Sequence, residues 1–180
     1  MKWEKKHILE ENVEWRGLPE SEMKPFKAYV NGKTPGICGT YAAAALTVLM
    51  AKREEVVTQS MDELLKGMEA FIEYAFPYLG TFYWDVQRGL NDEWKKYGYK
   101  THFNLFSEKV VPALLEDGVP VVVGTTAALG SPYKNHWIVV YQYAFDSNGK
   151  LWYKAYDNHG SITTVIPAVQ TLCAIWLEKL

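Results

Sequence analysis

Apolar residues in the first half of the chain recur at helical spacing. Residues 38–53 (CGTYAAAALTVLMAKR) are apolar at almost every position after the first turn, which predicts a buried, alanine-rich helix. A second helix is predicted to begin at Ser60, because Ser60 and Glu63 have the spacing of a capping box. Residues 83–96 predict a third helix. Residues 1–36 mix charges with several Pro and Gly breakers and predict irregular structure.

The pattern changes to β-branched and alternating segments in the second half. Residues 119–125, 136–145 and 150–157 predict strands, and the last two are joined by Asp146-Ser147-Asn148-Gly149, a strong hairpin signal. The other predicted elements are a short strand at 99–104, a helix at 107–117, a strand at 161–166 and a last helix that starts at Pro167. Helices come first and an antiparallel sheet second. We therefore expect an α+β fold, with an N-terminal helical half packed on a C-terminal antiparallel sheet in one domain that spans residues 1–180.

One cysteine stands at a chemically favourable place in this layout. The loop Thr34-Pro35-Gly36-Ile37 leads directly to Cys38 in the first turn of the predicted helix. A helix N-terminus carries unpaired N–H groups and partial positive charge, and both favour the thiolate, which is the nucleophilic form. A free cysteine beside an alanine-rich helix is just as often a small buried hydrophobe. The other cysteine, Cys173, lies among apolar residues and is predicted to belong to the core.

The predicted hairpin brings a histidine and a carboxylate together. If its loop holds four residues, Phe145 pairs with Lys150 and His136 lies opposite His159. His136 and Asp157 are then diagonal neighbours on one face of the sheet, with Cα atoms roughly 7–8 Å apart. A two-residue turn keeps them on one face, whereas a three-residue loop places Asn158 there instead.

These residues fit nucleophilic catalysis. Cys38 would attack a carbonyl carbon, and His136 would keep the thiol ionised and later protonate the leaving group. Asp157 would hold the other ring nitrogen of the histidine. Asn31 is the candidate side-chain donor to an oxyanion, and Tyr133 is a candidate substrate contact.

Simpler structural roles are the alternatives. His136 lies within an apolar strand, where a hydrogen-bonded core histidine is common, and Asp157 stands where a carboxylate often caps a turn. A zinc site built from Cys38, His136 and Asp157 would lack the short local spacing of typical ligand sets. We expect neither a metal nor a cofactor.

Composition limits the class of partner. The chain has 180 residues, 48% of them hydrophobic, and a formal net charge of −2, which argues against a nucleic-acid partner. No apolar run approaches the roughly 18 residues that a transmembrane helix needs, and the first residues show no signal-peptide core. The chain as it stands is expected to be soluble and cytoplasmic, or extracellular if a leader has been removed. The sequence does not indicate an oligomeric state.

The order of a helix-borne cysteine, a histidine and an aspartate resembles the papain-like cysteine peptidases. Asn135-His136-Trp137-Ile138-Val139-Val140-Tyr141 is similar to the papain-type segment around the catalytic histidine. Asp157 stands where that fold places its third catalytic residue, usually Asn. This aspartate and Cys38-Gly39 resemble the bacteriocin-processing (double-glycine leader) peptidase branch. That branch usually has a glutamine oxyanion donor six residues before the cysteine, where this chain has Gly32, so Asn31 is the expected replacement.

The resemblance implies a thiol-dependent hydrolase that cleaves a peptide or protein substrate at a peptide or amide bond. Two alternatives stay open at this point. One is an acyl transferase that uses the same three residues, because only the resolving nucleophile differs. The other is a non-catalytic binding or regulatory protein on a papain-like scaffold.

Overall fold

The computed structural model describes residues 12–32, 36–74, 78 and 80–180. Four α-helices lie in this part of the chain: α1 (Cys38–Arg53), α2 (Met61–Ile72), α3 (Tyr83–Trp94) and α4 (Val111–Glu116). The described strands are β1 (Arg16–Gly17), β2 (Tyr99–Asn104), β3 (Val121–Thr125), β4 (His136–Phe145), β5 (Leu151–Tyr156), β6 (Thr164–Pro167) and β7 (Thr171–Lys179). Short 3₁₀ helices complete the set, at Glu20–Ala28, Lys95–Tyr97, Ser107–Lys109, Ala127–Leu129 and Ala168–Gln170.

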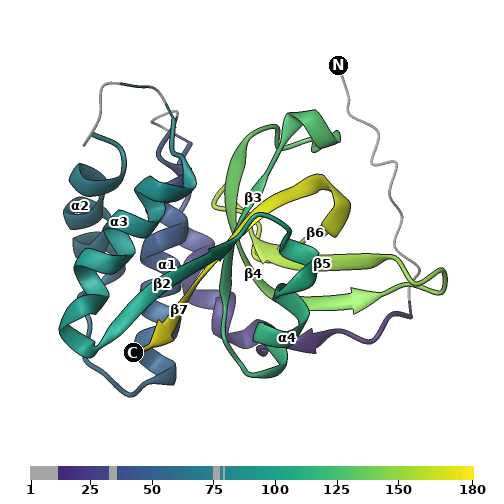
Figure 1. The fold of residues 1–180 in the computed structure, drawn as a ribbon, viewed down its shortest axis with the longest axis horizontal. Coiled ribbons are helices and arrows are strands. Elements are labelled where there is room, and N and C mark those ends of the chain that lie inside the picture. Colours follow the sequence, from purple (N-terminus) through teal and green to yellow (C-terminus); the bar gives the residue numbers. More distant parts are fainter. Residues whose placement is uncertain (1–11, 33–35, 75–77, 79) are drawn as a thin grey trace.

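The helices and the sheet form two sides of the molecule. The described strand pairs are all antiparallel, and the strand order is β2-β7-β3-β4-β5-β6. β1 pairs with the C-terminal part of β4. Helices α1, α2 and α3 gather on one side of the molecule (Figure 1), and α4 packs separately against β1, β3 and β4. The expected α+β architecture, with helices packed on an antiparallel sheet, is confirmed.

Helix α1 connects the two halves because it is apolar on nearly every face. Its alanines, Ala42 to Ala45, are fully buried, and small side chains let the helix approach α2, α3 and β4 together. The indole N–H of Trp94 on α3 donates to Thr47 of α1 at 3.2 Å. The predicted bounds of this helix are confirmed, and so is the capping box of Ser60 and Glu63 at the start of α2.

Several expectations about other elements are wrong in detail. The residues after Pro167 form one 3₁₀ turn and then the long strand β7, where a helix was expected. β7 fills the space between β2 and β3 and bonds to both, so sheet pairing outweighs the local helix-start signal of proline. The expected helix at 107–117 is divided into a 3₁₀ turn and α4. Residues 12–32 contain β1 and a 3₁₀ helix where irregular structure was expected.

The hairpin of β4 and β5 reaches the expected register by a different route. At the turn Phe145 pairs with Leu151 and not with Lys150, which is one step away from the four-residue prediction. A bulge between Val140 and Gln142 then shifts the pairing by one residue, so that Val139 faces Tyr156 as predicted. The ends of β4 and β5 therefore bring His136 toward residues 157–159. Among the described residues, no helix is long and apolar enough to cross a membrane.

Candidate active site

Cys38 is the first residue of α1, and its side chain is partly buried. The backbone amide of Trp137, the residue after His136 in β4, interacts with the thiol and favours its ionised form. The structure thus brings the start of α1 against the start of β4. This contact joins two segments that lie about a hundred residues apart in the sequence.

Burial decides the protonation state of this thiol. Loss of solvent raises the pKa of Cys38 above its ordinary value, and this outweighs the backbone groups of Trp137, Gly39 and Cys38 itself, which lower it. The position at the helix N-terminus therefore does not by itself lower the pKa of Cys38, and activation of this thiol stays a prediction. Both described cysteines are free, and burial raises the pKa of Cys173 to about 12.

His136 is buried at the start of β4 and held by a main-chain group. Its Nε2 lies 2.7 Å from the backbone carbonyl oxygen of Asp157. Because a carbonyl oxygen can only accept, Nε2 carries the hydrogen and Nδ1 carries the lone pair. Burial, as the main cause, lowers the pKa of His136 to about 4, so the ring is neutral near pH 7. The sequence predicted an imidazolium beside a thiolate, whereas burial favours a neutral imidazole at this position.

Two aromatic rings flank this imidazole. The ring of Tyr133 stacks on it with centroids 5.7 Å apart and planes 16° apart, and the ring of His159 lies 4.1 Å away. His159 is exposed. Its position follows from the hairpin register, which placed it opposite His136. The role of Tyr133 as a substrate contact stays a prediction.

The carboxylate of Asp157 has other partners than the histidine. Its Oδ1 accepts from the backbone N–H groups of His159 and Ser161, each at 2.9 Å. Its Oδ2 accepts from the hydroxyls of Thr164 at 2.7 Å and Tyr133 at 3.0 Å. The expectation that the Asp157 carboxylate holds the imidazole is wrong, because this carboxylate closes the turn between β5 and β6. The backbone carbonyl of Asp157 holds the imidazole of His136 instead.

This geometry predicts a mild effect for Asp157→Asn. The amide keeps the shape of the side chain and can donate to the two hydroxyls, which can turn to accept. We expect kcat/KM for peptide cleavage to fall less than about tenfold, whereas a carboxylate that orients a catalytic histidine would cost roughly 10⁴-fold. The free energy of unfolding should fall by about 1–2 kcal/mol.

Asp146→Asn is the matched control, because its carboxylate also accepts several N–H groups within a turn, from Asn148, Lys150 and Trp152. It should lower stability to a similar degree and leave cleavage unchanged. A loss of activity near 10⁴-fold in Asp157→Asn alone would show that the carboxylate reaches the histidine during catalysis.

Asn31 is tied to the residue that follows Asp157. Its side-chain amide donates to Oδ1 of Asn158, and its backbone N–H donates to the Asn158 carbonyl at 2.9 Å. Asn158 is fully buried and donates from Nδ2 to the Trp137 carbonyl at 2.8 Å. The expected oxyanion donor thus bonds, through Asn158, to the strand that carries His136.

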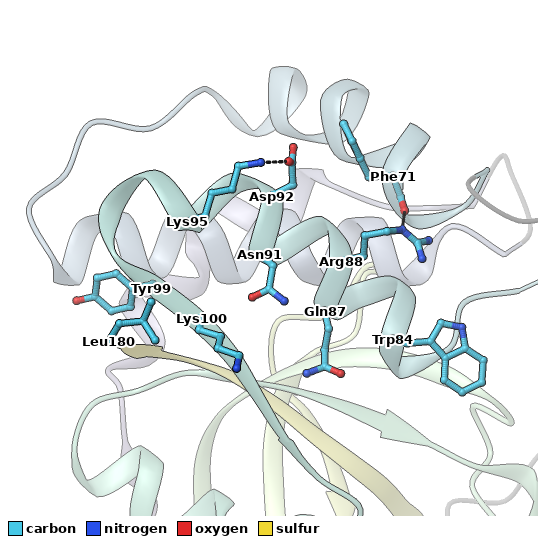
Figure 2. A pocket seen from close by; sticks show the side chains of 10 residues that line it. All are labelled: Phe71, Trp84, Gln87, Arg88, Asn91, Asp92, Lys95, Tyr99, Lys100 and Leu180. Atoms are coloured by element: carbon cyan, nitrogen blue, oxygen red, sulfur yellow. Dashed lines mark hydrogen bonds and ion pairs between the residues drawn. The ribbon is translucent and has the colours of Figure 1, made fainter.

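Within the described ranges, no three His, Cys, Asp or Glu side chains gather closely enough to hold a metal ion. An open groove of about 750 Å³ runs between α3 and β2, lined by residues that include Trp84, Asn91 and Lys100 (Figure 2). None of the candidate active-site residues lines this groove.

Comparison with known proteins returned one kind of similarity. No protein-family model and no curated protein matches the sequence. Among solved structures, the peptidase domain of Streptococcus ComA, a bi-functional ABC transporter involved in a quorum-sensing pathway, is similar with a TM-score of 0.47 and 18% sequence identity. The match covers 82% of this chain and 97% of that domain.

Proposed function

We propose that this protein is a thiol-dependent hydrolase that cleaves a peptide or amide bond through an acyl-enzyme on Cys38. His136 acts as the general base and then the general acid, and Asp157 orients it through the main-chain carbonyl. One observation carries the proposal: the thiol lies against the backbone of Trp137, while the adjacent imidazole is fixed as the Nε2–H tautomer with its basic nitrogen Nδ1 available.

The proposed steps begin from a neutral Cys38 thiol and a neutral His136 imidazole. Nδ1 of His136 takes the thiol proton as the sulfur attacks the substrate carbonyl carbon, and the resulting imidazolium gives that proton to the leaving amine. Nδ1 then takes a proton from water, whose oxygen attacks the thioester carbon to form a tetrahedral intermediate. Collapse of this intermediate expels the sulfur, which regains the proton from the imidazolium, and releases the acid.

The proposed oxyanion site lies at the start of α1. The backbone N–H of Cys38 is one donor, because the first N–H groups of a helix have no intrahelical partner. The Asn31 amide nitrogen carries two hydrogens and uses one of them on Asn158, and the second is the proposed other donor.

The test is digestion of an unbiased peptide library by the full chain, read by mass spectrometry. We expect fragments that carry the mass of added water, and fragments that carry an added amine instead would assign the site to acyl transfer. Absence of any cleavage across the library would overturn the proposal.

The pH profile of cleavage tests the neutral pair directly. His136 must be unprotonated to accept the thiol proton, and its pKa is lowered to about 4. As pH falls, kcat/KM should therefore stay level until the acid limb of the profile, with a midpoint near pH 4. An unperturbed histidine would place that limb near pH 6.5.

Two histidine variants calibrate this profile. A positive charge on His159 disfavours charge on His136, so His159→Gln should move the acid limb upward. His102→Gln, a change at a partly exposed position on β2, should leave it in place. An acid limb near pH 6.5 in the unmodified protein would contradict the neutral-pair mechanism.

A further inference from the structure

A glutamate from α2 holds the helix end that carries Cys38. Glu73 directly follows the last residue of α2, and its Oε1 accepts from the backbone N–H of Thr40 at 3.1 Å and from the Thr40 hydroxyl at 2.9 Å. Its Oε2 accepts from the hydroxyl of Thr81 at 2.6 Å. The residue at the N-cap position of α1, Ile37, offers no side-chain cap of its own. Glu73 therefore caps α1 from another helix.

The same contact places a negative charge in the first turn of α1. Cys38 and Thr40 both belong to this turn, whose N–H groups carry the partial positive charge of the helix. A carboxylate that accepts from these N–H groups competes with a thiolate for the positive end of the helix. Glu73 raises the pKa of Cys38 by charge repulsion, in addition to the larger effect of burial.

Gly39 allows this arrangement to be close. A Cβ atom at residue 39 would lie 2.4 Å from Cγ2 of Thr81, so only glycine admits Thr81 at this distance from the helix turn. The Thr81 hydroxyl, whose hydrogen goes to Glu73, also lies 3.2 Å from the Gly36 carbonyl oxygen. The Thr81 carbonyl accepts from the indole N–H of Trp137 at 2.8 Å. Thr81 thus links Glu73 to the loop before Cys38 and to the strand that carries His136.

The other charged groups near Glu73 leave its charge unneutralised. Asp85 on α3 adds to the negative potential, and the cation beside it, Arg88, pairs with Asp85 at 2.8 Å. Asp85 also accepts from Tyr78 at 2.6 Å. Burial lowers the pKa of His136 to about 4, which disfavours a positive charge on that ring near pH 7. Burial raises the pKa of Glu73, while its three hydrogen bonds lower it.

We propose that Glu73 is a positioning residue that fixes the first turn of α1 and, as a negative charge at that turn, disfavours the thiolate form of Cys38. The meaning of this restraint for catalysis rests on the proposed function, because it makes proton transfer to His136 the step that activates the nucleophile. The effect on the thiol itself does not depend on any substrate.

The test measures alkylation of Cys38 by iodoacetamide across pH in the full chain, with the site assigned by peptide mapping. Glu73→Gln removes the charge but keeps an oxygen for Thr40, and it should lower the pKa of Cys38 by about one, which raises the alkylation rate at pH 7 about tenfold. Glu73→Ala removes the same charge and should give the same direction of change. Glu73→Asp keeps the charge and should stay close to the unmodified protein.

Glu69→Gln is the matched control, because Glu69 lies one turn earlier on α2 and bonds to Tyr74 at 3.1 Å. Its charge acts on Tyr41 of α1, whereas Glu73 is the carboxylate that acts on Cys38. The control variant should leave the Cys38 profile unchanged. If Glu73→Gln and Glu73→Asp change the profile equally, or if neither charge-removing variant lowers the pKa, the proposal is overturned. If the pKa falls as expected but no library peptide is cleaved, the proposed function fails while the restraint on the thiol stands.

Discussion

Replacing Cys38 with alanine is expected to reduce peptide cleavage by at least about 10⁴-fold. The acyl-enzyme cannot form without the sulfur, and the other residues of a catalytic unit contribute little once the nucleophile is lost. The fold should survive, because the thiol is small and only partly buried, so the free energy of unfolding should change by less than about 1 kcal/mol. Labelling by a peptidyl acyloxymethyl ketone should disappear in the same variant.

Cys173→Ala separates nucleophile chemistry from the general presence of a thiol. Cys173 is buried in β7, and we expect its removal to leave both cleavage and labelling unchanged. Full cleavage by Cys38→Ala would rule out the nucleophile. A different result would identify a binding protein on this scaffold: neither the unmodified protein nor Cys38→Ala cleaves or is labelled, yet both bind the same peptide.

Asn158→Ala is expected to lower the free energy of unfolding by about 3–5 kcal/mol and to impair cleavage at the same time. The change deletes two side-chain hydrogen bonds in a fully buried place, one from the Asn31 side-chain amide and one to the Trp137 carbonyl. Asn158 also has a φ of +45°, which asparagine tolerates better than alanine does. Urea unfolding and the kcat/KM of cleavage measure the two effects.

The control for this prediction is Asn148→Ala, in the exposed turn of the β4–β5 hairpin. It removes the same amide group, and we expect a change of less than about 0.5 kcal/mol. Asn158→Gly gives back the backbone freedom and should recover only about 1 kcal/mol of the loss. Equal stabilities for the two alanine variants would contradict the proposed link from Asn31 through Asn158 to β4.

Local signals were enough to predict the elements that carry the candidate site. The capping box of Ser60 and Glu63 and the apolar run 38–53 placed two helices, because each signal lies within a few residues. Alternation placed β4 with its predicted bounds, and the same-face relation of His136 with the residues after β5 followed from the period of a strand. The observed loop shifts the pairing by one residue from the predicted register, and the bulge near Tyr141 restores the predicted pairing of Val139 with Tyr156.

Other features depend on parts of the chain that the sequence does not place side by side. β7 is a strand because β2 and β3 lie on either side of it, although Pro167 locally signals a helix. Glu73 gave no signal, because it gains its meaning only when the end of α2 meets the start of α1. The orienter of His136 is a backbone carbonyl, which every residue possesses and no residue type can reveal.

By itself, the sequence determined the order and type of most elements and the residue types that nucleophilic catalysis needs. Only the tertiary structure decided the protonation states of Cys38 and His136 and the partners of Asp157 and Asn31. The physical reason is that propensity, capping and periodicity act over a few residues of one segment. Desolvation and hydrogen bonding depend on every segment that packs around a group, and here burial outweighs the positive end of the helix.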